Sequence, residues 1–431
     1  MNPAPSSLDS LSAIVRRIGG DTVWLRVGRL FDGHESRGVS HLVFNRQNIR
    51  HVGDTPAAAL VRPGQTSPDL DLPDCTVLPG LVEAHAHLFL EGGELAPERR
   101  ADQLKLDDDE LFARAEFRLE RLLRLGIVAV RDAGDRNGVG LRLQRRCRSA
   151  ERGAMPCVDS PGAAIHHQGR YGSFMATPLE DQGGIEAAVA ARIAQGAHHI
   201  KLLATGIINF EKGAVTARPQ MPAEELTRAV AASRAQGRQT MVHCSGHDGV
   251  DNCIAARVDT IEHAYFVDRD QLALMRDLDI AWVPTLAPVQ FQLDRADILG
   301  WSETVRANLQ RILEAHAARL SDAADLGVRI VAGSDAGSHG VAHGHGFLRE
   351  LELMEQAGLS AERVLRSATG DASARLHPSE PAGVIAPGCP ARFILTEAPV
   401  LQSVRHLRAP AVVCFDGVIL SGGDDPGQPG M

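Results

Sequence analysis

Six polar side chains stand in short apolar segments of the chain, where each could bind a metal ion or take part in a reaction. His85 and His87 form an H-x-H pair in "VLPGLVEAHAHL". In an extended strand, residues i and i+2 point to the same side, so both imidazoles can reach one metal ion. The other four are Lys201, His243, His263 and Asp335. Imidazoles and a carboxylate suit divalent zinc, iron or manganese, so the residue types predict a metal site if the fold brings them together.

Lys201 is the least expected of the six. It lies in "HHIKLLATG", an apolar run that is typical of a buried strand. The chain has 45 Lys+Arg but only three lysines, Lys105, Lys201 and Lys212, so lysine is the rare choice here. One interpretation is a lysine whose ammonium group reaches solvent at the strand end. The other is that the amine itself has a chemical task.

The segments that carry these side chains predict a barrel. Strand-like runs alternate with helical patterns such as "DDELFARAEFRLERLLRLG", which is typical of βαβ units around a parallel sheet. The predicted strands cover residues 75–88, 127–132, 155–166, 198–204, 239–243, 258–263, 280–286 and 327–335. Eight strands over roughly 300 residues fit an α/β fold of the (β/α)₈ TIM-barrel type, whose active site forms at the C-terminal strand ends. All six side chains are therefore expected at the same end of the barrel, its mouth, where the strands have their C-terminal ends.

The two ends of the chain have a different pattern. Residues 22–56 alternate apolar and polar residues with Gly and Asn between them, and "GVIAPGCPARFILTEAP" and "APAVVCFDGVIL" repeat this near the other end. Each piece is short for a domain. We therefore expect one small composite β-sandwich domain from 1–77 plus 381–431, and the (β/α)₈ barrel over 78–380.

Composition narrows the classes of partner. The 431 residues carry a net charge of −9 that is spread along the chain, which argues against nucleic acid or an anionic membrane as the partner. The start of the chain does not resemble a signal peptide, and the seven cysteines form no C-x-x-C pair, so we expect a cytoplasmic protein with reduced thiols. The expected partner is a small-molecule substrate; a homo-oligomer is compatible with such a barrel.

With "VLPGLVEAHAHL", the later lysine and histidines and "GSDAG", the sequence resembles the metal-dependent amidohydrolase superfamily, in its imidazolonepropionase-like and prolidase-like branch (Xaa-Pro or Xaa-Arg dipeptidase-like). The resemblance covers nearly the whole chain. It implies two divalent ions, with zinc favoured over iron or manganese, bridged by N6-carboxylysine at position 201. The ligands it implies are His85, His87 and Asp335 on one ion and His243 and His263 on the other.

Physical chemistry agrees with that implication. Burial disfavours the ammonium form, so a neutral amine is available to capture CO₂ and become an anionic carbamate, which a guanidinium cannot do. The chain departs from the family in two places that do not touch these ligands. "CSGHDGVDNC" replaces an alanine-rich helix start, and Arg392 stands where an aspartate is usual.

The predicted activity is hydrolysis of a C–N bond. Two metals lower the pKa of a bridging water towards about 7, and the resulting hydroxide attacks the substrate carbonyl. Asp335 is the predicted general base, which passes a proton to the leaving nitrogen. A dipeptide or an N-acyl amino acid-like amide is the favoured substrate. The alternatives are a cyclic-amide, carbamate or urea hydrolase, a lactonase or esterase, and, more remotely, a non-catalytic scaffold; the complete ligand set argues against the last.

Five loop residues are candidates for substrate binding. Tyr171 and Tyr265, the only two tyrosines, follow predicted strands three and six, so both could face one pocket. Arg170 could bind a substrate carboxylate, or it is simply one more arginine on a solvated loop. His166 or His167 could hydrogen-bond the substrate carbonyl. The histidines in "DAGSHGVAHGHGF" are interpreted mainly as part of a mobile loop.

Overall fold

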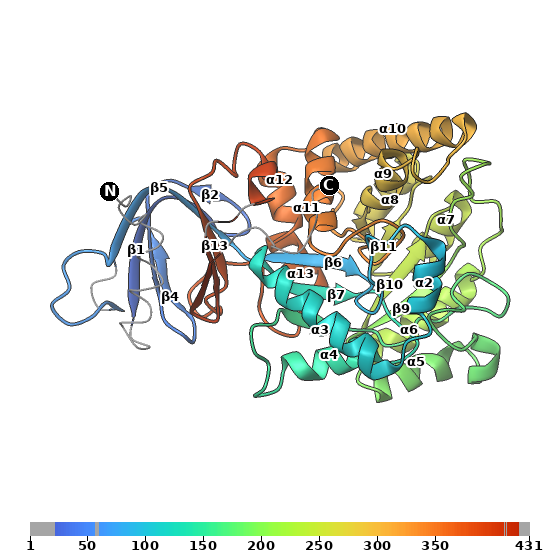
Figure 1. Cartoon of the computed structure of the whole chain (residues 1–431), viewed down its shortest axis with the longest axis horizontal. Coiled ribbons are helices and arrows are strands. Elements are labelled where there is room, and N and C mark those ends of the chain that lie inside the picture. The colour runs from blue at the N-terminus through green and yellow to red at the C-terminus, as the bar shows by residue number, and fades with distance from the viewer. Residues whose placement is uncertain (1–21, 57–59, 409, 411, 422–431) are drawn as a thin grey trace.

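The computed structural model describes residues 22–56, 60–408, 410 and 412–421. The strands in these ranges form one mixed sheet of eight strands and two smaller parallel sheets. Figure 1 shows the mixed sheet at one end of the molecule and the parallel strands, surrounded by helices, at the other. No helix of the described ranges has the length and apolar character to cross a bilayer. All seven cysteines are free thiols.

The mixed sheet joins the two ends of the chain. Its strands are β1 (Val23–Phe31), β2 (Ser36–Arg37), β3 (Ser40–Phe44), β4 (Ile49–Gly53), β5 (Leu70–Pro79), β13 (Phe393–Thr396), β14 (Val412–Phe415) and β15 (Val418–Ser421). β5 runs parallel to β1 on one side and antiparallel to β13 on the other. The rings of Phe44 and Phe393 meet edge to face, 5.1 Å apart, in the core beneath this sheet. Both ends of the chain therefore contribute to one small hydrophobic core.

The parallel strands close into the predicted (β/α)₈ barrel. They are β6 (Leu81–Ala86), β7 (Ile127–Asp132), β8 (Cys157–Asp159), β9 (His199–Leu203), β10 (Gln239–Cys244), β11 (Thr260–His263) and β12 (Ala281–Val283). Isolated bridges complete the ring: Ile165 pairs with Leu202, Trp282 with Ile330, and Ala86 with Ala336. The segment around residue 330 is therefore the eighth member, between β12 and β6, and the predicted fold class is confirmed.

Three of the predicted strands differ from the observed ones in more than their end residues, and a fourth, 280–286, is shortened to β12. The run at 75–88 is two strands in different sheets, β5 and β6, separated by Gly80. A Cβ on Gly80 would lie 2.3 Å from Cγ1 of Val128, so a glycine lets the chain pass closely against β7. The predicted strand 155–166 is regular only in β8. The predicted strand 327–335 makes only isolated bridges within the described chain.

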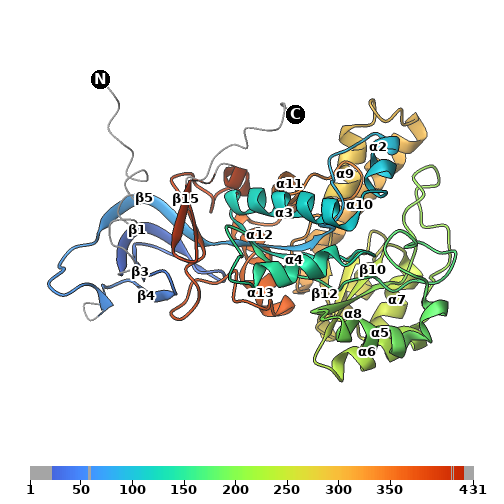
Figure 2. The ribbon, with the colours of Figure 1, turned by 60° about the horizontal axis from the view of Figure 1, so that its bottom comes forward.

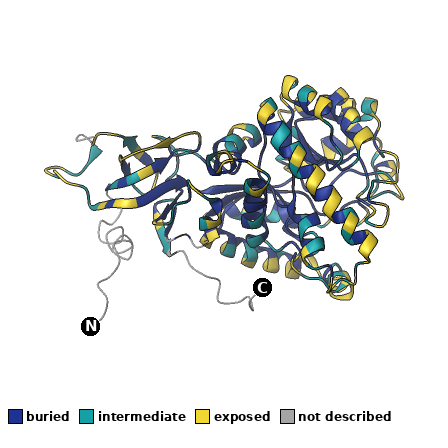
Figure 3. Cartoon of the chain, turned by 90° about the horizontal axis from the view of Figure 1, so that it is seen from above, coloured by how far each residue is buried: buried dark blue, intermediate teal, exposed yellow. Residues whose placement is uncertain are grey.

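Helices cover the outside of the barrel (Figure 2). They are α2 (Pro97–Gln103), α3 (Asp108–Arg124), α4 (Val139–Cys147), α5 (Ile185–Ala194), α6 (Ala223–Arg234), α7 (His247–Ala256), α8 (Arg269–Asp277), α9 (Ala287–Asp294), α10 (Glu303–Leu326), α11 (His345–Gln356), α12 (Ala361–Ser367) and α13 (Gly370–Leu376). In α3, the Asp107 side chain caps the first turn, and Leu111, Ala115, Leu119 and Leu122 bury one face. Figure 3 shows buried strands inside and exposed outer helix faces.

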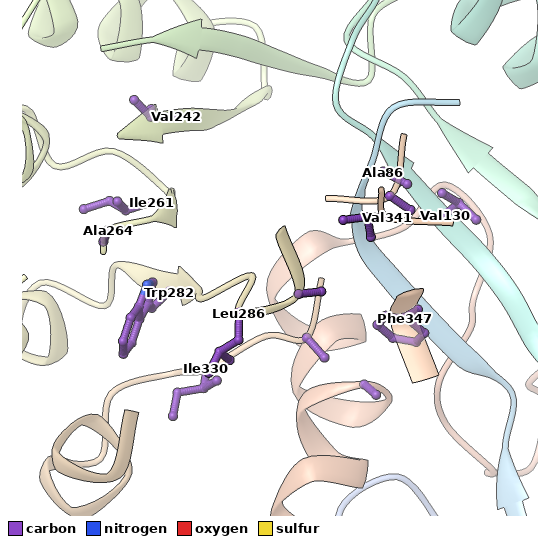
Figure 4. Close-up of a cluster of buried hydrophobic side chains, with 14 of the residues drawn as sticks. Ala86, Val130, Val242, Ile261, Ala264, Trp282, Leu286, Ile330, Val341 and Phe347 are labelled. Atoms are coloured by element: carbon purple, nitrogen blue, oxygen red, sulfur yellow. The ribbon is translucent and has the colours of Figure 1, made fainter. Parts of the chain in front are cut away.

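The apolar core of the barrel fixes the strands that carry the polar mouth. It contains strand side chains such as Val130, Val242 and Ile261, together with Phe347 from α11 (Figure 4). Trp282, also in this cluster, is fully buried, and its indole nitrogen donates a hydrogen bond to the carbonyl oxygen of His263 at 2.9 Å. Core packing thus reaches directly to the backbone of a predicted metal ligand.

Candidate metal centre and active site

His85, His87 and Asp335 meet at the C-terminal end of β6. Oδ1 of Asp335 lies 3.4 Å from Nε2 of His85 and 3.4 Å from Nε2 of His87. One ligand atom from each residue falls within 4.8 Å of the other two. Burial would raise the pKa of Asp335, but the two imidazoles hold it well below its ordinary value, so the carboxylate is ionised at neutral pH. This is a compact set of nitrogen and oxygen donors that suits one divalent cation.

The "GSDAG" sequence has a steric basis in this cluster. A Cβ on Gly333 would lie 2.9 Å from the backbone nitrogen of His85, and a Cβ on Gly337 would lie 2.6 Å from the carbonyl oxygen of His87. Asp335 itself has φ 56°, a left-handed conformation that few non-glycine residues adopt. The two glycines therefore let the eighth segment pack against the histidine pair.

His243 and His263 come from the ends of the neighbouring strands β10 and β11. Their ring centroids are 4.6 Å apart, and the ring of His263 is 5.1 Å from that of His85. Burial, followed by the charge of Lys201, lowers the pKa of His243 to about 3, and burial also lowers the pKa of His263 well below its ordinary value. Neutral imidazoles are the form that binds metal ions.

Lys201 lies in β9, next to Met241 of β10, and is 2% exposed. Its Nζ atom is buried and has no hydrogen-bond partner among the residues that the structure describes. Burial lowers the pKa of this amine to about 8. A buried polar atom left without a partner is costly, so this amine fits a site that a further group completes. The interpretation of Lys201 as a side chain that reaches solvent is wrong, because the side chain is enclosed.

Two buried glutamates support the histidine pair, and neither was identified from the sequence. Oε2 of Glu262 lies 2.7 Å from Nδ1 of His85, while Oε1 faces Nη1 of Arg131 at 3.5 Å. Glu83 accepts hydrogen bonds from the backbone nitrogens of His85 and Ser334, at 3.1 and 2.9 Å. The signal was present: each glutamate interrupts an apolar run beside a histidine, in "LVEAHA" and "TIEH", as Lys201 does in its own strand.

A cavity of ≈ 490 Å³ opens above these side chains. Its floor includes His87, His243, His263 and Asp335. Its walls are mainly apolar and come from several loops: Leu90, Leu104, Tyr171, Phe174, Ile207, Ile208, Phe210, Tyr265, Pro288, Val289 and Trp301. Arg100, Ser245, Gln292, Ser338 and His339 add polar groups. The arrangement can hold a mostly apolar small molecule against a cluster of metal-type ligands.

Two of the five predicted substrate-binding residues line this cavity. The ring of Tyr171 lies 5.0 Å from that of His243, and the ring of Tyr265 stacks on His263 with centroids 5.9 Å apart. The hydroxyl group of Tyr265 donates to the carbonyl oxygen of Thr285 at 2.7 Å. The hydroxyl group of Tyr265 is therefore engaged by the protein, whereas no bond from the hydroxyl group of Tyr171 to a described residue is observed.

The structure does not place His166, His167 or Arg170 in the cavity wall. The ring nitrogens of His166 face the carbonyl oxygens of His167 and Ala176, at 2.9 and 3.1 Å. The ring of His167 lies between two glutamates, and the guanidinium of Arg170 donates to the carbonyl oxygen of Arg218. The sequence placed these side chains near the mouth of the barrel. His166 instead bonds within its own loop, and His167 and Arg170 point to Glu225 and Arg218, which are 58 and 48 residues away in the chain.

Comparison with known proteins gives matches over most of the chain. The Amidohydrolase family matches residues 76–421. An uncharacterised protein of Mycobacterium bovis is 28% identical over 299 residues, 69% of this chain and 73% of that protein. Ochratoxinase of Aspergillus niger is 27% identical over 266 residues, 60% of this chain and 54% of the enzyme. The crystal structure of a Xaa-Pro dipeptidase with bound methionine matches with TM-score 0.78 and 25% identity, over 93% of this chain and all (100%) of the dipeptidase.

Proposed function

Because this chain belongs to the Amidohydrolase family and is a hydrolytic enzyme, we propose that it is a binuclear metal-dependent hydrolase that cleaves the amide C–N bond of a small molecule. A dipeptide or an N-acyl amino acid is the proposed substrate. The observation that carries the proposal is the buried Nζ of Lys201, which has no hydrogen-bond partner among the described residues, in a site with His243 and His263, whose pKa values burial lowers. The cavity above them offers room for a molecule of this size.

The proposed ligand set assigns every member of the cluster. One ion would be held by His85, His87 and Asp335. The other would be held by His243 and His263, and a carboxylated Lys201 would bind both ions. Zinc is favoured because imidazole and carboxylate donors suit it. When bound, the ions polarise the substrate carbonyl and make water a better nucleophile. The backbone and a hydrogen bond fix the orientation of His263. Its φ is 71°, and its Nδ1 lies 2.7 Å from Oγ1 of Thr285.

Asp335 is the proposed proton carrier. Its low pKa keeps the carboxylate ionised, so it can accept a proton from water as the water oxygen bonds to the carbonyl carbon. The same proton then passes to the leaving nitrogen as the C–N bond breaks, which yields a carboxylic acid and an amine. Burial raises the pKa of Tyr171, so its phenol stays protonated and can donate a hydrogen bond to the carbonyl oxygen.

A paired lysine experiment tests the metal centre. Lys201→Ala should remove most bound metal, measured by elemental analysis of the purified protein, and abolish amide hydrolysis, because no carbamate can form. Lys212→Ala is the matched control, since Lys212 lies on an exposed loop. Normal metal content and turnover in Lys201→Ala would refute the proposed bridging role.

A substrate panel tests the reaction class. Dipeptides and N-acyl amino acids should be hydrolysed faster than cyclic amides, carbamates, ureas and lactones. The measured product is the new amine for the nitrogen compounds and the new carboxylic acid for the lactones. If a compound of one of the other four classes is turned over faster, that class is the substrate and the proposal of amide hydrolysis is wrong.

A further inference from the structure

One cation stands in the otherwise mainly apolar wall of the cavity. Arg100 comes from α2, the short helix that follows β6, and it faces the same space as Phe174, Ile207 and Trp301. Among the described residues that line this cavity it is the only lysine or arginine. A cation on the wall of an apolar cavity is a strong determinant of which ligands bind there.

The contacts of Arg100 leave part of its guanidinium group unused. Nη2 donates to the carbonyl oxygen of Gly337 at 3.3 Å. Nη1 is buried and lacks a hydrogen-bond partner in the described part of the chain. Its neighbour Arg99, by contrast, points to solvent and binds both carboxylate oxygens of Glu94, at 2.6 and 2.8 Å. Glu94 is thus already bound by Arg99, and Nη1 of Arg100 is left to donate to an acceptor outside the described residues.

The position of Arg100 also fixes where that acceptor should lie. Gly337, to which it is tethered, is two residues beyond Asp335, the residue proposed to protonate the leaving nitrogen. In an N-acyl amino acid, the carboxylate is two bonds away from that nitrogen. A carboxylate on the leaving side of the scissile bond would therefore approach Arg100, while the acyl group would lie against the apolar wall.

We propose that Arg100 binds the free carboxylate of the substrate's leaving group, so that the substrates are N-acyl α-amino acids with a large apolar or aromatic acyl group or side chain. This inference rests on the proposed amide hydrolysis and narrows it. It gives Arg100 the role that the sequence suggested for Arg170. Guanidinium–carboxylate pairs are strong and directional when they are shielded from water.

Matched substrates test the role in catalysis. N-benzoyl-L-phenylalanine should be hydrolysed with kcat/KM about 100-fold above that of its carboxamide, N-benzoyl-L-phenylalaninamide, since a lost charged hydrogen bond costs about 2–3 kcal/mol. Arg100→Met should lower kcat/KM for the acid to near the carboxamide value, mainly through KM, and leave the carboxamide nearly unchanged. Arg100→Lys should recover part of the loss. Arg99→Met is the control and should behave as the wild type.

A binding measurement separates this inference from the proposed function. Calorimetry measures the binding of N-benzoyl-L-phenylalanine to two proteins, the Asp335→Asn variant and the double variant Asp335→Asn/Arg100→Met. The dissociation constant of the double variant should be at least about 30-fold larger. Equal binding in the two proteins, or equal hydrolysis of acid and carboxamide by the wild type, would overturn the role of Arg100 and leave amide hydrolysis standing. Binding that depends on Arg100 without hydrolysis of either compound would overturn the proposed function alone.

Discussion

At the scale of single residues, the barrel holds two buried charged groups in opposite situations. Lys201 is enclosed, and its Nζ has no hydrogen-bond partner in the described part of the chain. Glu262, by contrast, has a partner for each carboxylate oxygen, His85 on one side and Arg131 on the other. Burial would raise the pKa of Glu262, but the hydrogen bond from His85 and the charge of Arg131 lower it, so it remains an anion. An anion on Nδ1 directs Nε2 of His85 into the site and makes it a stronger metal ligand.

This arrangement gives a prediction for Glu262→Gln. The amide keeps the size of the side chain but removes the anion, so metal affinity should fall about 10- to 100-fold. Competition with a chelator measures this directly, and circular dichroism reports whether the fold is kept. The matched control is Glu352→Gln, because Glu352 is also a buried partner of arginine, Arg408 at 2.8 Å, but is not part of the site. Unchanged affinity in Glu262→Gln would show that the position of His85 does not depend on this carboxylate.

At the scale of elements, the site depends on how closely the eighth segment approaches β6. Two backbone hydrogen bonds hold the segments together. The backbone nitrogen of Asp335 donates to the carbonyl oxygen of His85 at 2.8 Å, and the backbone nitrogen of His87 donates to the carbonyl oxygen of Ala336 at 2.7 Å. Since these bonds hold the histidine pair and the aspartate in one register, a side chain that separates the two segments should separate the ligands.

Gly337→Ala tests this contact. Gly337 has φ +99°, and a Cβ would meet the carbonyl oxygen of His87 at 2.6 Å. Gly196 is the matched control, with φ +95° and nothing within 4 Å of its Cβ. Both variants should lose about 1–2 kcal/mol of stability from the left-handed backbone. Gly337→Ala should in addition lose about 100-fold in kcat, since small displacements of catalytic groups are costly. An equal loss of activity in both variants would contradict the steric argument.

The elements also show which parts the sequence could predict. The position of His243 and His263 at the barrel mouth was predicted because the side-chain direction at a barrel strand end follows from the fold itself; their role as metal ligands stays a prediction. The division of 75–88 into two strands was missed because both strands are apolar, and hydrophobicity does not tell one sheet from another. His167, in a loop, and Arg100, in the short helix α2, were misjudged or missed because tertiary partners, which the sequence does not reveal, decide where their side chains point.

At the scale of the whole molecule, the side chain of Arg392 lies between the mixed sheet and the barrel. Its Nε donates to Asp416 at 2.6 Å within the mixed sheet region, and its Nη1 lies 2.9 Å from Sγ of Cys157 in β8 of the barrel. Glu380 also contacts both Arg392 and Arg152. Buried to 5% exposure, this guanidinium connects the sheet built from both chain ends to the barrel.

Arg392→Met should therefore weaken the connection between the sheet and the barrel without altering the metal centre. The free energy of unfolding should fall by about 2 kcal/mol, because the carboxylates of Asp416 and Glu380 lose a shielded cationic partner. Arg26→Met, which breaks the exposed pair with Asp71, should cost less than about 1 kcal/mol and is the control. Urea unfolding measures both, with bound metal quantified in each variant. Full stability in Arg392→Met would mean that the apolar contacts alone hold the two parts together.

The pH dependence of that loss provides a further check on its cause. Burial would raise the pKa of Glu380, but Arg392 and Arg152 hold it at about 2, below the ordinary value of about 4.3. A carboxylate with a lowered pKa stabilises the folded state above about pH 4.3, and this stabilisation is lost as pH falls towards 2. The stability difference between wild type and Arg392→Met should therefore be constant from pH 7 to pH 5 and shrink below about pH 4.3. A difference independent of pH across that window would assign the loss to packing rather than to charge.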